Sequence, residues 1–291
     1  MAKLFVNNIN KKFKNHQVLK DLSFKLEDNG VYALVGPNGS GKTTLFNIIT
    51  NLINMDSGEV LINDIDNSDP KIFNYLTLLK DNSVLYEYLT GLDHLNFISY
   101  LHKIDKKRVD EIIEELNIGS YINNKVSSYS LGMKQHLLIA MAILPDPEII
   151  LMDEPINGLD PTSIINFRNL IMKLKENKLI VISSHTLSEI DYITNNILFL
   201  KDGSILKEDM SKYNLQEYRY KIFEEDIVKV RELDSKIFTY FKLEDNTLIY
   251  KTKEDIYLFD KFLIENKIRY KSIEKKKIGA EERYKNLFTH N

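Results

Sequence analysis

The sequence of 291 residues contains no cysteine and no apolar run long enough to cross a membrane. The missing thiols exclude disulfides, thiolate catalysis and cysteine-based metal sites, and they fit a reducing compartment. The longest unbroken apolar run covers residues 137–144, whereas a spanning helix needs roughly 20 residues. The N-terminus has neither an apolar core nor a small-residue cleavage site, so we expect no signal peptide. Work at a membrane would therefore require another protein as the anchor.

The chain also lacks a strong excess of either charge. Its formal net charge is −3, so it does not show the surplus of Lys and Arg that is typical of nucleic-acid-binding domains. The basic cluster at residues 275–277 is more typical of a solvated edge than of a binding patch. We therefore expect no nucleic-acid partner.

Proline and glycine become scarce toward the C-terminus. All six prolines lie at or before Pro161, and no glycine occurs between Gly203 and Gly279. This change predicts a boundary near residue 210, with one domain at residues 1–210 and a smaller one at 211–291. In the smaller domain we expect strands at 217–223, 236–243, 247–252 and 269–273 and a helix at 255–266. Together these elements indicate a small α+β domain.

The first domain alternates strand and helix signals. Apolar runs at 30–35, 148–152 and 179–183 suit strands that are buried on both faces. Helix signals follow them at 42–53, 162–175 and 187–195. This alternation predicts a parallel sheet with crossover helices. A mainly helical stretch, about residues 84–145, separates the first two strands and indicates an inserted helical lobe.

A glycine-rich segment directly follows the first strand. It consists of Gly36, Pro37, Asn38, Gly39, Ser40, Gly41, Lys42, Thr43 and Thr44, and it fits the pattern G-x-x-x-x-G-K-[ST]. Glycines let the backbone approach phosphate oxygens, and the N–H groups at the start of the following helix attract an anion. We expect Lys42 to reach the β- and γ-phosphates of a nucleotide and Thr43 to offer its hydroxyl to Mg²⁺. A chance match has a probability of about 1 in 100, and the flanking strand and helix supply the required context.

Polar side chains end the second and third strands. Asp153 and Glu154 follow the second apolar run; Asp153 is expected to hold Mg²⁺ and Glu154 to act as general base on the attacking water. His185 ends the third strand, where an imidazole can contact the γ-phosphate. In isolation, acids at a strand end are often only solvated, and a single histidine is usually structural. Beside a phosphate loop, Lys42, Glu154 and His185 are the predicted catalytic residues.

Residues 129–135, with the sequence YSLGMKQ, resemble the signature L-S-G-G-Q of ATP-binding-cassette (ABC) ATPases. Ser130 and Gly132 match its second and fourth positions. The phosphate loop, this segment, the two acids, residues 157–160 (NGLD) and His185 follow one another in the order and spacing of that family. The variant signature is similar to that of bacterial ABC-2-type exporters, including bacitracin- and lantibiotic-resistance pumps. The resemblance covers about residues 3–208.

The resemblance implies a fold, ligands and partners. The implied fold is α/β, a P-loop NTPase (RecA-like) core with an antiparallel β subdomain and a helical subdomain, followed here by the small α+β domain. Two such domains dimerise head to tail, so that each ATP and its Mg²⁺ lie between the phosphate loop of one and Ser130 and Gly132 of the other. Asp160 belongs to the loop that joins the subunits. The second chain is identical or related, and a separate transmembrane permease holds the pair at the cytoplasmic face of the membrane.

Three further positions correspond to nucleotide-contacting or metal-contacting positions of the family. Phe13 matches an aromatic residue that stacks on adenine and Val18 an apolar residue beside it, although Phe13 fits a strand core equally well. The family also has a glutamine shortly before the segment that corresponds to residues 85–90 (LYEYLT). Here Asp81 occupies that place, or Lys80 if the alignment shifts by one residue. Since a carboxylate can bind Mg²⁺ through water, we expect Asp81 to replace the glutamine as a metal-binding group.

These features favour the ATPase subunit of a membrane exporter, with an amphipathic peptide, antibiotic or lipid as cargo. A soluble ABC ATPase that acts on ribosomes or nucleic acid is one alternative, although such proteins carry two cassettes or long coiled coils. A regulatory cassette that binds ATP without hydrolysing it is another. The altered loop at Asp81 keeps that alternative open, whereas the intact Glu154 and His185 oppose it.

Overall fold

The computed structural model describes residues 4–185, 187–213, 216–231, 241–252, 256–277 and 280–288. The chain divides into two compact units, Met1–Glu208 and Asp209–Asn291. Each unit has its own hydrophobic core.

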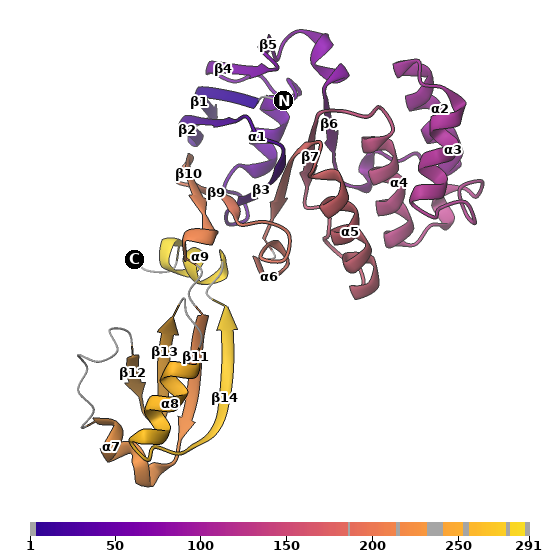
Figure 1. Ribbon diagram of the computed structural model, residues 1–291. Helices are drawn as coiled ribbons and strands as arrows, with labels where there is room; N and C mark the ends of the chain where they lie inside the picture. Colours follow the sequence, from indigo (N-terminus) through magenta and orange to yellow (C-terminus); the bar gives the residue numbers. More distant parts are fainter. Residues whose placement is uncertain are drawn as a thin grey trace. The chain divides into compact units, whose positions relative to one another are not determined.

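A six-stranded sheet forms the centre of the first unit, in the order β10-β9-β3-β8-β7-β6 (Figure 1). The strands are β3 (Gly30–Val35), β6 (Leu76–Leu79), β7 (Ile149–Asp153), β8 (Leu179–Ser184), β9 (Asn196–Lys201) and β10 (Ser204–Asp209). β3 pairs in parallel with β8 and β9, and β7 pairs in parallel with β6 and β8. Because the strands are parallel, the residues that follow β3, β6, β7 and β8 meet at one edge of the sheet.

Helices connect these strands, as the alternating pattern predicts. They are α1 (Lys42–Ile49), α5 (Pro161–Leu174) and α6 (Leu187–Ile190). The predicted helix at 187–195 is too long, because α6 ends at Ile190. One further turn follows it, in which the N–H of Thr194 donates to the carbonyl of Ile190 at 3.0 Å. The Thr194 hydroxyl donates to the carbonyl of Val31 at 2.6 Å and accepts from the N–H of Asn196 at 3.0 Å, which ties the end of this segment to the sheet.

A second, antiparallel sheet belongs to the same unit. Its order is β2-β1-β4-β5, with β1 (Leu4–Phe13), β2 (His16–Leu26), β4 (Ser57–Ile62) and β5 (Ile65–Asp66). Buried side chains alternate with exposed ones along β2, as expected of a strand with one solvated face. The buried face joins the core of the six-stranded sheet through Leu19, Leu22 and Val60.

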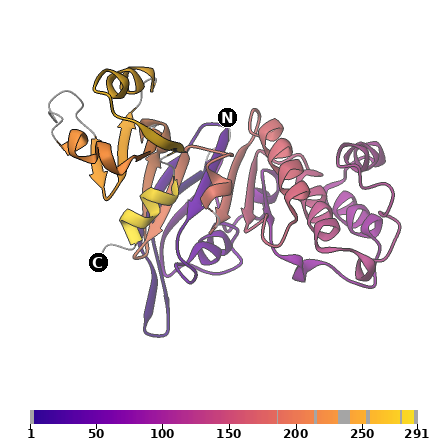
Figure 2. The same cartoon turned by 90° about the horizontal axis from the view of Figure 1, so that it is seen from below.

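Three helices between β6 and β7 form the predicted lobe: α2 (Gly91–His102), α3 (Lys106–Glu115) and α4 (Leu131–Ile143). Figures 1 and 2 show this lobe and the antiparallel sheet on opposite sides of the first unit. α2 begins with a capping box, in which Thr90 and Asp93 bond each other's backbone N–H. Within the described ranges, no helix has the length and apolar character that a bilayer span would need.

The second unit is an antiparallel sheet with helices, in the order β12-β13-β11-β14. Its elements are β11 (Gln216–Ile222), α7 (Ile227–Arg231), β12 (Phe241–Glu244), β13 (Thr247–Thr252), α8 (Tyr257–Glu265), β14 (Tyr270–Lys277) and α9 (Ala280–Phe288). Up to β14 this is the β-α-β-β-α-β succession of ferredoxin-like domains. Residues 236–240 of one predicted strand, and residue 255 of the predicted helix, lie outside the described residues.

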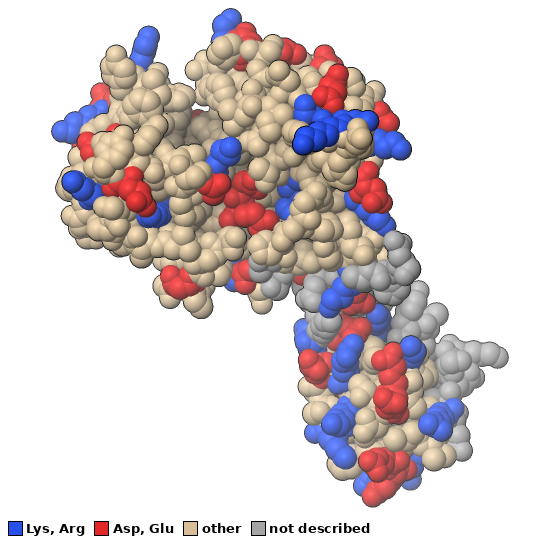
Figure 3. All heavy atoms as spheres, turned by 180° about the vertical axis from the view of Figure 1, so that it is seen from behind, with Lys and Arg blue, Asp and Glu red and all other residues tan. Residues whose placement is uncertain are grey.

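The core of the second unit lies between its sheet and α8. Tyr220 is fully buried against Phe259 and Leu263 of that helix, and the rings of Tyr250 and Phe259 stack with centroids 3.9 Å apart. In the view of Figure 3, Lys and Arg alternate with Asp and Glu over this unit. Tyr220, Tyr250 and Phe259 therefore pack between the small sheet and α8.

Candidate active site

The glycine-rich loop connects β3 to α1 through two left-handed glycines. Gly39 has a φ of 79° and Gly41 a φ of 106°, values that other residues adopt only with strain. A Cβ atom on Gly41 would lie 2.8 Å from Cγ1 of Val18 on β2. The loop therefore requires glycine at this point for two reasons, its backbone angle and its close approach to β2.

Lys42 is folded back onto this loop. Its ammonium donates hydrogen bonds to the carbonyls of Gly36 at 2.8 Å and Pro37 at 3.3 Å, and it lies 3.8 Å from Oε1 of Glu154. Only 7% of the side chain is exposed. Burial lowers the pKa of Lys42, and the carboxylates of Glu154 and Asp153 act against that shift. The cation is thus held beside the predicted phosphate position and the predicted general base.

Asp153, the last residue of β7, is gripped through both of its oxygens. The Thr43 hydroxyl donates to Oδ2 at 2.7 Å, and the Ser183 hydroxyl donates to Oδ1 at 2.5 Å. The pairing of β7 with β8 sets the second contact, since Asp153 lies opposite Ser183 in the register. The two predicted Mg²⁺ groups, Thr43 and Asp153, therefore lie side by side, as one metal ion would need.

Glu154 turns away from the strand in a left-handed conformation, with a φ of 49°. Such a conformation costs a non-glycine residue of order 1–3 kcal/mol. The turn directs the Glu154 carboxylate to His185, whose Nδ1 lies 2.8 Å from Oε2, while Oε1 faces Lys42. Glu154 is thus within contact distance of both other residues predicted to be catalytic.

The signature residues form a second cluster, at the starts of α4 and α5. Ser130 caps α4 by accepting from the N–H of Met133 at 3.2 Å. Asp160 caps α5, accepting from the N–H of Thr162 at 2.9 Å and of Ser163 at 3.1 Å. A Cβ atom on Gly132 would lie 3.3 Å from the Ser163 hydroxyl and 3.9 Å from Oδ2 of Asp160. Ser130, Gly132 and Asp160 therefore belong to one surface.

Phe13 and Val18 lie on the hairpin of β1 and β2. Val18 lies against the loop at Gly41, where its Cγ1 would be 2.8 Å from an added Cβ atom. Phe13 is 45% exposed, and the Lys11 ammonium lies 5.3 Å from its ring centroid. The strand-core interpretation of Phe13 is therefore wrong. Stacking on adenine stays a prediction.

Asp81 follows β6 at the same edge of the sheet. Its Oδ1 accepts from the N–H of Ser83 at 2.8 Å, so that Asp81 caps a short 3₁₀ turn, Asn82–Val84. Hydrogen bonds from the side chain and backbone of Ser83 lower the pKa of Asp81. Among the described residues, no three His, Cys, Asp or Glu side chains surround a common metal position. A role for Asp81 at Mg²⁺ stays a prediction.

Ser183 is the residue at this site that sequence reasoning missed. It is fully buried, donates to Asp153 and accepts from the N–H of Glu154 at 2.9 Å. The available signal was a hydroxyl at the end of an otherwise apolar strand, LIVIS, since buried hydroxyls need partners.

The chain is similar in sequence to several known proteins. The family model for ABC transporters matches residues 19–157. The uncharacterized ABC transporter ATP-binding protein YdbJ of Bacillus subtilis is 37% identical over 210 residues, which cover 70% of this chain and 68% of YdbJ. The lantibiotic transport ATP-binding protein SrtF of Streptococcus pyogenes is 31% identical over 217 residues, which cover 74% of this chain and 94% of SrtF.

A solved structure of an ATP-binding subunit of an ABC transporter has the same fold. It superposes with a TM-score of 0.67 at 25% identity, covering 72% of this chain and 90% of that one. The expected fold class, a P-loop ABC cassette with mixed sheets and helices, is thereby confirmed. The chain belongs to the ABC transporter family, as an ATP-binding subunit with the ATPase activity that powers transport.

Proposed function

We propose that the sheet edge formed by Lys42, Thr43, Asp153, Glu154 and His185 is where ATP is hydrolysed. The observation that carries this proposal is the contact of Glu154 with His185 on one oxygen and Lys42 on the other. ATP would draw Lys42 from the loop carbonyls to its phosphates, which frees Glu154 to accept the proton of the attacking water. His185 would keep the Glu154 carboxylate in place during that step.

Thr43 and Asp153 would hold Mg²⁺, which neutralises charge on the nucleotide's phosphates. Mg²⁺ prefers oxygen ligands and is usually bound by one or two carboxylates together with phosphates and water, and the hydroxyl and carboxylate here lie 2.7 Å apart. ATPase assays of Thr43→Val test this assignment. We expect Mg²⁺-dependent hydrolysis to be lost in Thr43→Val and kept in Thr43→Ser, and equal loss in both variants would contradict it.

A second chain would complete the site. Leu131, between Ser130 and Gly132, is 43% exposed, and the start of the 13-residue helix α4 attracts anions. Both support docking on the phosphates bound by another copy or a related chain. The double variant Asn38→Cys/Leu131→Cys tests this docking of two chains, because the native chain has no cysteine that could form a competing disulfide. We expect an intermolecular disulfide that depends on ATP, and equal yields without nucleotide would argue against the arrangement.

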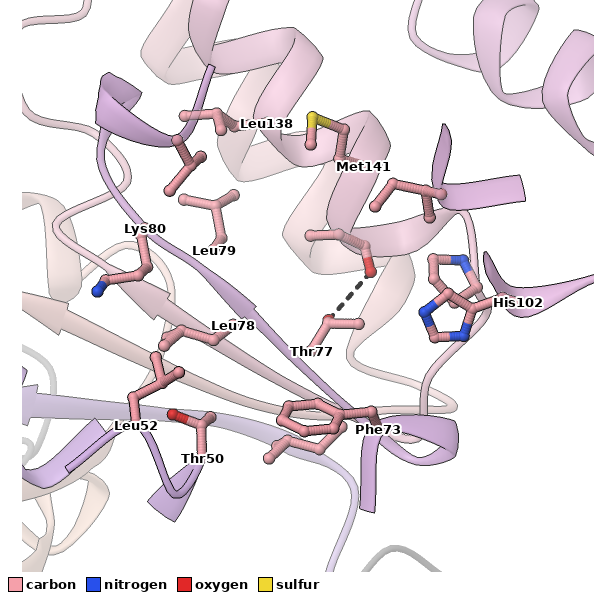
Figure 4. Close-up of a pocket in the computed structure, with 15 residues that line it drawn as sticks. Thr50, Leu52, Phe73, Thr77, Leu78, Leu79, Lys80, His102, Leu138 and Met141 are labelled. Carbon is pink, nitrogen blue, oxygen red and sulfur yellow. Dashed lines mark hydrogen bonds between the residues drawn. The ribbon is translucent and has the colours of Figure 1, made fainter. Parts of the chain in front are cut away.

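A permease would dock in the groove shown in Figure 4. This cavity of about 270 Å³ lies between β6, α2 and α4, and its lining includes Phe73, Leu79, Lys80, His102 and Met141. Leu79 pairs with Met152, the residue before Asp153, so a partner here would touch the strand next to the hydrolytic site. Copurification of membrane proteins with native chain and with Met141→Arg tests this docking. Identical partners in both samples would contradict it.

We further propose that the cargo is an amphipathic peptide, antibiotic or lipid moved outward from the cytoplasmic face. The support is the variant signature YSLGM at residues 129–133, together with the similarity to SrtF, a lantibiotic transport protein. Cells that carry Glu154→Gln in place of the native chain should become more sensitive to lantibiotics or bacitracin. Unchanged sensitivity to both would contradict export of these peptide antibiotics.

A further inference from the structure

Ser183 occupies a position that connects Asp153, the last residue of β7, with Glu154, which follows it. Its side chain is completely buried at the end of β8. A serine hydroxyl has one proton to donate and two lone pairs to accept with. Here the proton goes to Oδ1 of Asp153 at 2.5 Å, and a lone pair accepts from the N–H of Glu154 at 2.9 Å. One hydroxyl therefore spans two neighbouring residues of the site.

The contact with Asp153 fixes the direction of that carboxylate. With Oδ1 held by Ser183, the other oxygen, Oδ2, faces the hydroxyl of Thr43 at 2.7 Å. Without Ser183 only the Thr43 hydroxyl would restrain the rotation of the carboxylate about χ2, which is a soft torsion. The pair of oxygens proposed for Mg²⁺ thus depends on a third side chain that would not touch the metal.

The contact with Glu154 fixes a strained peptide. Glu154 has a φ of 49°, and such conformations persist only where the surroundings over-determine them. The Ser183 hydroxyl holds the N–H of Glu154, while His185, two residues further along the same segment, holds its carboxylate at 2.8 Å. The end of β8 therefore grips Glu154 by its backbone and by its side chain.

We propose that Ser183 is a positioning residue for ATP hydrolysis, which aims Asp153 at Thr43 and holds Glu154 in its left-handed turn. The inference rests on the proposed function of Asp153 and Glu154. It predicts a defect in turnover and in metal affinity, whereas a serine that only fills space in the strand would affect stability alone.

The test uses the purified full chain with Ser183→Ala. We expect kcat to fall by about 10- to 100-fold, as is typical when a residue that orients metal ligands is lost. The affinity for Mn²⁺ in the presence of a non-hydrolysable ATP analogue, measured by electron paramagnetic resonance, should fall by about 10-fold. Ser183→Thr keeps the hydroxyl and should restore both quantities. If Ser183→Ala does not fold, Ser183→Cys, with its similar size and weak donor, takes its place.

Thr194→Val is the matched control. The Thr194 hydroxyl also donates once and accepts once, to Val31 and from Asn196, but it lies where β3 begins, at the opposite edge of the sheet. It should lose stability as Ser183→Ala does while keeping kcat and Mn²⁺ affinity. Equal losses of kcat in the two variants, or native kcat and Mn²⁺ affinity in Ser183→Ala, would overturn the inference.

The variant Glu154→Gln separates a failure of the proposed hydrolytic site from a failure of the positioning role of Ser183. If Glu154→Gln hydrolyses ATP as the native chain does, the proposed function itself fails. If Glu154→Gln is inactive while Ser183→Ala turns over normally, the hydrolytic site stands and only the positioning role of Ser183 is refuted.

Discussion

Replacing Lys42 by methionine should remove most of the ATP-dependent stabilisation and hardly affect the stability of the protein without nucleotide. In the nucleotide-free state, two contributions of Lys42 to the free energy of unfolding oppose each other and nearly cancel. The hydrogen bonds to the carbonyls of Gly36 and Pro37 contribute about 1.5–3 kcal/mol each, as bonds to charged groups do. Burying the ammonium, which lowers the pKa of Lys42, costs several kcal/mol. We therefore expect the free energy of unfolding of Lys42→Met to lie within about 1 kcal/mol of native.

Bound ATP makes the Lys42 ammonium strongly stabilising, because the positive charge pairs with the phosphates. At an ATP concentration of about 100 times the native dissociation constant, binding adds about 2.7 kcal/mol of stability. This corresponds to a rise in Tm of about 5–10 °C for a unit of this size. If the lysine contact is worth about 2.7 kcal/mol, the dissociation constant rises about 100-fold. The same ATP then adds only about 0.4 kcal/mol, or about 1 °C.

Scanning calorimetry with and without ATP measures both quantities. EDTA in the buffer prevents hydrolysis during the scan, and Lys106→Met, at an exposed lysine on α3, serves as the control that should keep the native ATP shift. A Lys42→Met variant that keeps more than about half of the native ATP shift would refute the phosphate contact. A fall in Tm of more than about 10 °C without ATP would show that Lys42 is mainly structural.

Three further predictions concern other parts of the chain. Gly41→Ala should lower the free energy of unfolding by about 1–3 kcal/mol in denaturant titrations, because a φ of 106° and a contact of 2.8 Å with Val18 both oppose a Cβ atom; native stability would contradict the loop geometry. Asp81→Ala should reduce the ATPase rate, and a rate equal to native would leave Asp81 only its capping role. Glu217 is buried, which raises its pKa, but hydrogen bonds from Arg219 and Lys251 outweigh this and lower it. Its stabilisation is therefore present above the ordinary carboxyl pKa of about 4.3 and is lost as pH falls through the lowered value. Glu217→Gln should destabilise the second unit by about 1–2 kcal/mol at pH 7 after allowance for solvent screening, and a difference from native that does not shrink in acid would refute the ion pair.

The sequence predicted the strands that carry the site because these strands are buried on both faces. A strand of that kind is a continuous apolar run, which made residues 30–35, 148–152 and 179–183 recognisable as strands. The polar residues that end these runs lie at one edge of the sheet because the strands are parallel. The loop motif was equally local, since its glycines, Lys42 and Thr43 are neighbours in the chain.

What the sequence could not show depends on partners that are distant in the chain. The proposed role of Ser183 depends on its hydrogen bond to Asp153, 30 residues earlier. The pattern of residues within β8 does not predict that contact. The hydrogen bond that ties the segment after α6 to the sheet joins Thr194 to Val31, 163 residues away. The strand order of the second unit also arises from pairings between remote segments, and its βαββαβ succession became visible only in three dimensions.

Single-turnover cleavage of ATP by Glu154→Gln tests the catalytic site most directly. The amide keeps the size of the carboxylate and removes its basicity. Loss of a general base typically costs about 10²–10⁴ in rate, so we expect cleavage at least about 100-fold slower than native, unimpaired ATP binding and an accumulating ATP-bound dimer. Cleavage within about threefold of the native rate would contradict the assignment of Glu154 as the general base.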